Sequence, residues 1–281
     1  MPVMASKLTG DRTGIQNPWS FPSNWLLVVF WLVVIATLFF FGLIFIGLLI
    51  YGSQISWKEV LGNPEVRFAT GLTLKTTLLA ALLALITALP CAYVLARYHF
   101  PGKIFLDTLL DLPLVLPPLV SGLALLILFG PVLGHIFARL GIAIVFTTGG
   151  VVVAQWFIAV PFTVKMLRET FEGIDSRYER MARVLGCTWA KAFFTVTLPM
   201  AGRGIGAAAA MTWARTLGEF GATAMLAGVT RMKTETLPVA IFLNMSIGEL
   251  RLAIAISLML FLTAMLILGF FKILTRRKVR T

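Results

Sequence analysis

Long apolar runs separated by short polar stretches are the main pattern along this chain. The first run, from Trp25 to Tyr51, contains no charged residue. About 20 apolar residues in a helix cross the roughly 30 Å hydrocarbon core of a bilayer, so this run can span with some tilt. It is also longer than the apolar core of a signal peptide. We therefore interpret it as a retained first membrane span.

Five further spans are predicted from the same pattern. They cover approximately residues 69–96, 105–130, 150–166, 204–228 and 252–273. Residues 131–149 are apolar but interrupted by glycine, which suits a short interfacial or re-entrant segment. The predicted fold is an all-α, polytopic membrane protein of about six transmembrane helices.

The polar stretches divide the chain. Residues 1–23 form a polar N-terminal segment, residues 24–274 the transmembrane domain, and residues 275–281 a basic tail. Within the transmembrane domain, the longest polar stretch covers residues 168–203.

Composition supports a membrane protein, because 59% of the residues are hydrophobic and 13% are charged, against about 45–50% and 25% in soluble domains. The net charge is +12. With both termini placed in the cytoplasm, the cytoplasmic segments hold 16 of the 24 Lys and Arg residues, the opposite side holds 7, and Arg215 lies within a span. This asymmetry follows the positive-inside rule. It explains the basic charge without a nucleic-acid partner.

Motifs for covalent chemistry or nucleotide hydrolysis do not occur in the sequence. There is no G-x-x-x-x-G-K-[ST] phosphate loop, no H-E-x-x-H metal motif and no G-x-S-x-G nucleophile elbow. The two histidines, His99 and His135, lie far apart in predicted loops, so no metal site is expected. Energy for uphill transport must therefore come from a partner subunit or from an ion gradient.

The fifth predicted span carries a row of small residues. They recur every four positions, at Gly202, Gly206, Ala210, Ala214, Gly218 and Ala222. Such rows let transmembrane helices approach closely. The row is consistent with tight packing inside the chain and also with packing along a pathway or dimer axis where helices move.

Two charged residues, Arg215 and Glu219, lie near the middle of the same span. Charges at this depth usually pair or face water, and a spacing of four residues permits an ion pair on one helix face. The alternative is that Arg215 attracts an anion while Glu219 tunes it.

The third predicted span is interrupted by Pro113, Pro117 and Pro118, which remove helical hydrogen bonds. Ser121 follows one turn later. The resulting kink either lines a pathway or serves packing only.

The polar stretch contains a basic amphipathic helix. Met181, Val184, Leu185 and Trp189 recur at helical spacing among arginines. The helix either lies on the anionic inner leaflet or docks into a cytoplasmic partner.

Two segments resemble known permeases. YERMARVLG (178–186) followed by AKAFFTVTLP (190–199) resembles the EAA loop of bacterial ABC importer permeases. Ala182, Gly186, Leu198 and Pro199 fall in register with that motif. Arg180 occupies the position of its glutamate, and Glu179 lies one residue earlier. The segment WARTLGEFGA (213–222) with KTETLP (233–238) is similar to the molybdate, tungstate and sulfate branch of these permeases, and most similar to the molybdate permeases.

The resemblance implies a division of labour. It implies a homodimer in the cytoplasmic membrane of a bacterium or archaeon, two cytoplasmic ATPase subunits that bind ATP and Mg²⁺, and an extracytoplasmic binding protein that delivers the oxyanion. This chain itself is then a transport subunit, not an enzyme, and binds no cofactor. An ion-coupled secondary anion transporter is the alternative.

Two sets of site residues follow from the resemblance and the patterns together. The polar stretch 168–203 is then a cytoplasmic coupling segment. Its ATPase-coupling set is Glu179, Arg180, Ala182, Gly186, Trp189, Leu198 and Pro199. The translocation-pathway or gate set is Pro117, Pro118, Ser121, Arg215, Gly218, Glu219 and Gly221.

Overall fold

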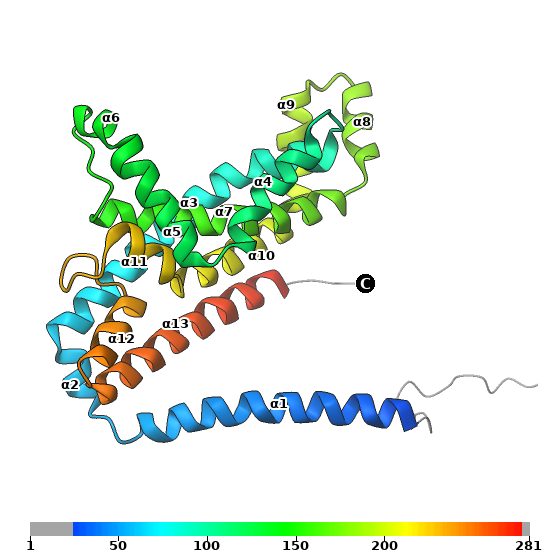
Figure 1. Ribbon diagram of the computed structural model, residues 1–281. Helices are drawn as coiled ribbons and strands as arrows, with labels where there is room; N and C mark the ends of the chain where they lie inside the picture. The colour runs from blue at the N-terminus through cyan, green and yellow to red at the C-terminus, as the bar shows by residue number, and fades with distance from the viewer. Residues whose placement is uncertain (1–24, 277–281) are drawn as a thin grey trace, which may run out of the picture. The chain divides into compact units, whose positions relative to one another are not determined.

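The computed structural model describes residues 25–276, with side chains to residue 273. The N-terminal segment 1–23 and most of the basic tail lie outside the described residues. The described part is helical throughout (Figure 1). Its α-helices are α1 (Trp25–Gly52), α2 (Trp57–Gly62), α3 (Pro64–Arg97), α4 (Lys103–Val115), α5 (Pro118–Ile127), α6 (Gly134–Arg139), α7 (Thr148–Glu172), α8 (Ser176–Val184), α9 (Trp189–Ala192), α10 (Leu198–Leu217), α11 (Gly221–Ala227), α12 (Leu237–Ser246) and α13 (Leu250–Arg276). Two π-helical turns, η1 (Leu128–Val132) and η2 (Phe193–Thr197), interrupt this order.

The helix α1 forms most of a separate unit of the chain, which ends at Ile50. Its 28 residues are apolar on every side, and a helix that is hydrophobic all round suits a lipid environment. The first predicted span is therefore confirmed.

The second unit, from Tyr51 onward, is organised around the pair α3 and α7. One face of α3 carries fully buried alanines at intervals of four residues, namely Ala80, Ala84, Ala88 and Ala92. Side chains this small let the α7 backbone approach closely. A row of small residues at a helix contact therefore lies on the second predicted span, where no such row was predicted.

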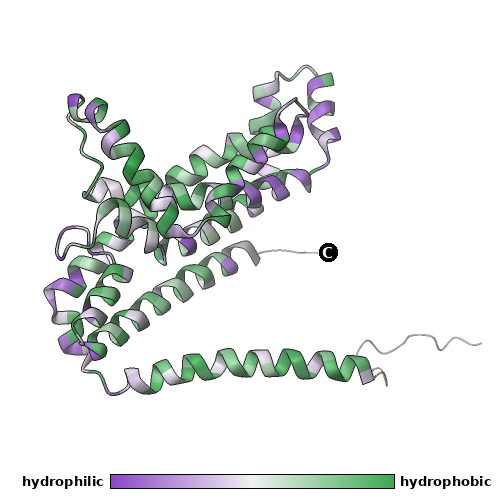
Figure 2. Cartoon of the chain, viewed as in Figure 1, coloured by the Kyte–Doolittle hydropathy of each residue, from purple (hydrophilic) through white to green (hydrophobic). Residues whose placement is uncertain are grey.

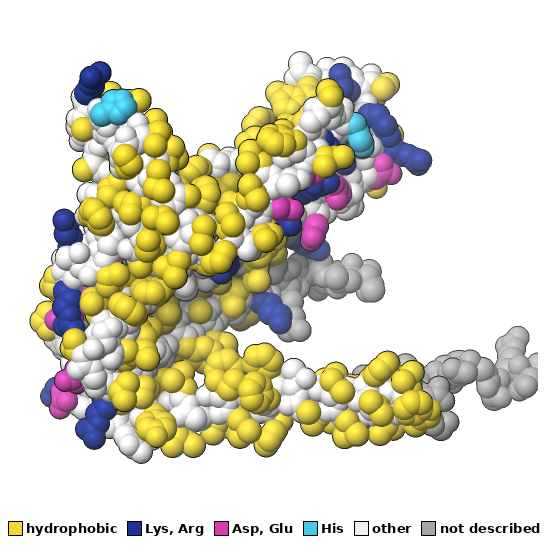
Figure 3. All heavy atoms as spheres, in the orientation of Figure 1, with side chains coloured by type: hydrophobic (Ala, Val, Ile, Leu, Met, Phe, Trp, Pro, Cys, Tyr) yellow, Lys and Arg dark blue, Asp and Glu magenta, His cyan; other side chains and the backbone are white. Residues whose placement is uncertain are grey.

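The two ends of this unit differ in polarity. Near one end α2 leads into α3, and at the other end Arg97 of α3 contacts Glu179 of α8. Figure 2 shows hydrophilic residues concentrated at α2 and at α8, and apolar residues along the helices between them. In the face drawn in Figure 3, the hydrophobic side chains cover the middle, and charged side chains gather near the ends. This banding is expected of a protein that crosses a bilayer.

Four described helices are long and apolar enough to span a membrane: α1, α3, α7 and α13. The pair α4 and α5 gives a fifth if it counts as one span, and the two helices are bent by 112° at the break between them. The prolines therefore produce more than the predicted kink, because Pro117 and Pro118 end one helix and begin another.

The fifth predicted span is not continuous. The helix α10 ends at Leu217, and α11 begins only at Gly221. Hydropathy averaged over a window conceals a break of three residues. The count of about six spans is therefore matched only approximately, although the all-α polytopic fold is confirmed.

Candidate functional site

The residues of the predicted coupling set lie at one end of the second unit, on the short helices α8 and α9, in the turn between them and at the start of α10. Asp175 begins α8 by accepting a hydrogen bond from the N–H of Arg177 at 2.9 Å, and this satisfies one of the free amides of the first turn. Thr188 caps α9 in the same way, accepting from the N–H of Lys191 at 3.3 Å. Each helix of the segment therefore has its own start signal in the sequence.

Gly186 provides the turn between α8 and α9. Its φ angle is +91°, a left-handed conformation that glycine adopts without a steric penalty. Its N–H donates to the carbonyl of Arg183, and the N–H of Cys187 donates to the carbonyl of Ala182, both at 3.0 Å. This pair of hydrogen bonds is a Schellman motif, which closes the end of a helix. Gly186 and Ala182, which both match the EAA motif, thus take part in the same helix-ending motif.

The outer face of α8 is apolar in the middle and basic at its rim. The exposed fractions of Met181, Val184 and Leu185 are 63%, 87% and 84%. Arg177 and Arg180 border the shallow pocket that these three side chains line. An apolar centre surrounded by charge is typical of protein interfaces.

The remaining coupling residues connect this surface to the membrane helices. One face of Trp189 stacks on Phe193 at a centroid distance of 6.1 Å, while 47% of Trp189 stays exposed. Leu198 and Pro199 open α10, directly after the π-helical turn η2. The helix α9 is therefore joined to α10 through η2 alone, with no intervening loop.

Glu179 differs from the rest of this set because it points inward. It is 7% exposed, and its carboxylate accepts a hydrogen bond from the hydroxyl of Tyr93. Its second oxygen lies 3.7 Å from Nε of Arg97. The sequence analysis identified neither Tyr93 nor Arg97, because both resemble ordinary residues at the end of a span.

Four of the predicted pathway residues, Pro117, Pro118, Ser121 and Gly221, lie where α5 packs on α11. An added Cβ at Gly221 would lie 2.8 Å from Cβ of Pro118, and one at Gly122 would lie 2.7 Å from Cα of Ala222. The two helices touch backbone to backbone here. Ser121 is fully buried beside this contact, and its hydroxyl has no hydrogen-bond partner within the described residues.

The predicted ion pair between Arg215 and Glu219 is not formed. Because α10 ends at Leu217, the two residues do not share a helix face, and the ion pairs of the described residues do not join them. Glu219 is 3% exposed and accepts a hydrogen bond from the N–H of Ala222 at 2.9 Å. Arg215 is exposed on α10.

The predicted row of small residues also changes. Gly202, Gly206, Ala210 and Ala214 belong to α10, but Gly218 follows its end and Ala222 belongs to α11. An added Cβ at Gly218 would meet no atom within 4 Å. The prediction of close packing at Gly218 is therefore wrong for contacts within this chain.

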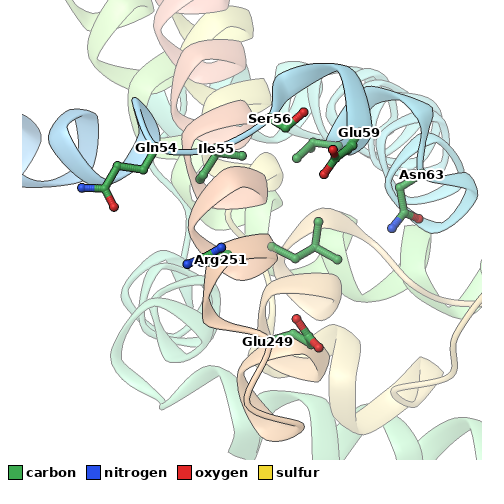
Figure 4. A pocket seen from close by; sticks show the side chains of 9 residues that line it. Gln54, Ile55, Ser56, Glu59, Asn63, Glu249 and Arg251 are labelled. Atoms are coloured by element: carbon green, nitrogen blue, oxygen red, sulfur yellow. The ribbon is translucent and has the colours of Figure 1, made fainter.

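At the opposite end of the unit, an open pocket of about 310 Å³ lies between α2 and the start of α13 (Figure 4). Glu59, Glu249 and Arg251 supply its charged side chains. The sequence analysis did not find it, since these residues are far apart in the chain and belong to no motif.

Comparison with known proteins shows the family of the chain. Residues 80–280 match the family described as the binding-protein-dependent transport system inner membrane component. The chain belongs to this family. The matched region contains the entire coupling segment, and the permease is accordingly a multi-pass membrane protein and a transport subunit, not an enzyme.

Curated relatives of the permease carry oxyanion names. It is 35% identical over 221 residues to the sulfate transport system permease protein CysT of Salmonella typhimurium, with 77% of this chain and 80% of the relative covered. It is 34% identical over 233 residues to the molybdenum transport system permease protein ModB of Mycobacterium bovis, with 80% and 88% covered. The predicted resemblance to the molybdate, tungstate and sulfate permeases is therefore confirmed.

A solved structure supports the fold of the permease. A chain of a bacterial alginate ABC transporter, in complex with an alginate pentasaccharide-bound periplasmic protein, matches with a TM-score of 0.74 and 18% identity. The match covers 92% of this chain and 96% of that one. At this level of identity the likeness concerns the fold alone.

Proposed function

We propose that this permease imports a tetrahedral oxyanion, molybdate or tungstate in preference to sulfate, in an ATP-driven complex. Two copies of the chain form the pathway, two ATPase subunits bind ATP and Mg²⁺ on the cytoplasmic side, and an extracytoplasmic binding protein delivers the anion. Both termini then lie in the cytoplasm, as the distribution of basic residues predicts.

The observation that carries the proposal is the outer face of α8. The exposed side chains of Met181, Val184 and Leu185 form an apolar surface with an arginine border. This surface lies at the end of the second unit that is predicted to face the cytoplasm. The sequence itself contains no phosphate-binding loop. A transport subunit without its own ATP site takes its energy from a partner subunit or an ion gradient, and the apolar surface of α8 favours a docked ATPase.

Arg215 supports the second copy of the chain. It is exposed on α10, and a charged side chain that faces lipid near the middle of a bilayer is costly. A partner copy or a water-filled pathway relieves that cost. In a homodimer, two Arg215 side chains then provide positive charge along the route of an anion.

The decisive experiment is ATP hydrolysis by the complex reconstituted in liposomes with its ATPase subunit and binding protein. The binding protein is loaded in turn with molybdate, tungstate, sulfate or phosphate. Stimulation by molybdate or tungstate alone supports the proposal in full. Stimulation by sulfate alone keeps the ATP-driven importer and overturns the preferred cargo.

A docking variant makes the test sharper. Val184→Glu places a charge in the apolar centre of the α8 surface, and we expect the ATPase subunit to be lost on purification. Ile247→Glu is the matched control, because Ile247 is also exposed, at 61%, but lies after α12 at the other end of the unit. Anion uptake that needs an ion gradient and proceeds without ATP would instead support the secondary transporter.

A further inference from the structure

The attachment of α8 to the membrane helices depends on one polar side chain. Glu179 is the only buried residue of α8. Its carboxylate accepts a hydrogen bond from the Tyr93 hydroxyl and lies 3.7 Å from Nε of Arg97. Within the described residues, this hydrogen bond and this ion pair connect α8 to α3. The helix therefore holds to its neighbours through charge and hydrogen bonding, with no buried apolar side chain of its own.

Tyr93 and Arg97 are four residues apart and share one face of α3. This places both partners of Glu179 at the end of the helix that packs most extensively on α7. A displacement of α8 thus acts on the last turn of the central helix pair.

The ring of Tyr93 extends this link to three further elements. It packs edge-on against Phe171 of α7, Trp189 of α9 and Phe193 of η2, with centroid distances of 5.6, 5.8 and 4.9 Å. Offset and edge-to-face arrangements of this kind are the favoured ones for aromatic pairs. Tyr93, which belongs to α3, therefore contacts α7, α8, α9 and η2.

The arrangement is poorly explained by stability alone. Buried ion pairs are often no better than apolar residues of the same volume, because both charges lose their hydration. Here Nε and one terminal nitrogen of Arg97 are buried without a hydrogen-bond partner in the described residues, and the Arg97–Glu179 separation is long for a direct bond. A packed apolar contact would fix α8 more firmly. A polar link instead gives a directional connection.

From this geometry we infer that Tyr93, Arg97 and Glu179 form an internal link that transmits the movement of α8 to α3. The three are positioning residues: Glu179 acts through Tyr93 and Arg97, inside the chain, and makes no direct contact with the ATPase. The inference rests on the proposed docking of an ATPase subunit on α8.

The test uses the full complex in liposomes, with binding protein loaded with molybdate, and measures molybdate taken up per ATP hydrolysed. Tyr93→Phe removes only the hydroxyl and keeps the ring contacts. Glu179→Gln removes the charge. We expect each variant to retain its ATPase subunit and to lower uptake per ATP by about fivefold or more, the usual lower range of coupling between sites.

A double-mutant cycle separates this link from a simple structural role. If the two side chains act through each other, the double variant is no worse than the poorer single variant. Arg97→Lys keeps the cation and is expected to retain more coupling than Arg97→Gln. Glu172→Gln is the matched control, because Glu172 pairs with Arg168 on the exposed end of α7 and makes no contact with Glu179 among the described ion pairs.

Each other outcome overturns a defined part of the reasoning. Wild-type coupling in both Tyr93→Phe and Glu179→Gln refutes the link while leaving the proposed function intact. Loss of the ATPase subunit in Glu179→Gln, with additive effects in the double variant, shows direct contact with the ATPase. A wild-type complex that never retains an ATPase refutes the proposed function itself. If Glu179→Gln does not assemble, Tyr93→Phe alone decides.

Discussion

The contact between α5 and α11 leaves no room for a side chain at Gly122, and this gives a quantitative prediction for Gly122→Ala. The added Cβ would lie 2.7 Å from Cα of Ala222 and 2.8 Å from both its carbonyl oxygen and Cβ of Met225. Ordinary carbon contacts are about 3.5–4.0 Å, so the two helices must separate by roughly 1 Å. Two of the three obstructing atoms belong to backbone, which cannot move aside as a flexible side chain does.

Overpacking of this kind costs about 1–3 kcal/mol. Alanine recovers about 1 kcal/mol of that through its better helix propensity than glycine. The net loss is then about 0–2 kcal/mol. For a chain of this size, roughly 2–4 °C of melting temperature corresponds to each kcal/mol, so we expect a decrease of up to about 8 °C from wild type, and of about 2–12 °C from a variant that gains the helix propensity without the overpacking.

The assay is thermal unfolding of the purified permease in detergent, followed by molybdate uptake in the reconstituted complex. Gly71→Ala is the control, since Gly71 also lies inside a helix but an added Cβ there would meet no atom within 4 Å. It should match or exceed the wild-type melting temperature. A Gly122→Ala protein as stable as Gly71→Ala would show that α5 and α11 are not in close backbone contact.

Two further predictions concern the ends of the second unit. Gly186→Ala forces a side chain into a φ of +91°, which costs about 1–2 kcal/mol. We therefore expect trypsin to cleave the α8–α9 segment roughly five- to thirty-fold faster than in wild type, and Gly186→Asn to be less affected. Equal cleavage of wild type and Gly186→Ala would contradict the strained turn. At the other end, burial raises the pKa of the fully buried Glu235 carboxyl, and Glu65 adds to this, while the N–H of Met232 and the charge of Arg231 oppose it. Because the folded-state pKa is raised, its stabilising contribution is present at low pH and lost as the pH rises above the ordinary glutamate value. As the pH is lowered from 7.5 to 5, the melting temperature of the wild type should therefore rise relative to that of Glu235→Gln. A difference between the two proteins that stays constant over this range would show that Glu235 does not contribute to the pH dependence of stability.

Much of the fold is predictable because lipid imposes a simple requirement on sequence. The runs that became α1, α3, α7 and α13 are long and apolar, and no short-range detail changes their interpretation. The coupling segment is predictable for a different reason. Its cap residues, its glycine in the left-handed conformation and its proline at the start of α10 are local signals that act within a few residues.

The pathway was less predictable, because its structure depends on where a helix stops. Gly218 and Glu219 fit a helical pattern in the sequence, yet α10 ends before them and the expected ion pair with Arg215 is lost. The partners of Glu179 were also beyond reach. Tyr93 lies 86 positions away in the chain, and a single sequence carries no signal for a contact between such distant residues.

The carboxylate of Glu219 has a consequence for the cargo. Free amides at the start of a helix attract anions, and at the break between α10 and α11 the N–H of Ala222 already binds the protein's own carboxylate. In the proposed importer, a dianion that reaches the break finds that donor already occupied by the carboxyl group of Glu219. If the proposed oxyanion passes this break, the Ala222 amide offers it no free donor, and selection of the cargo is left to an earlier step.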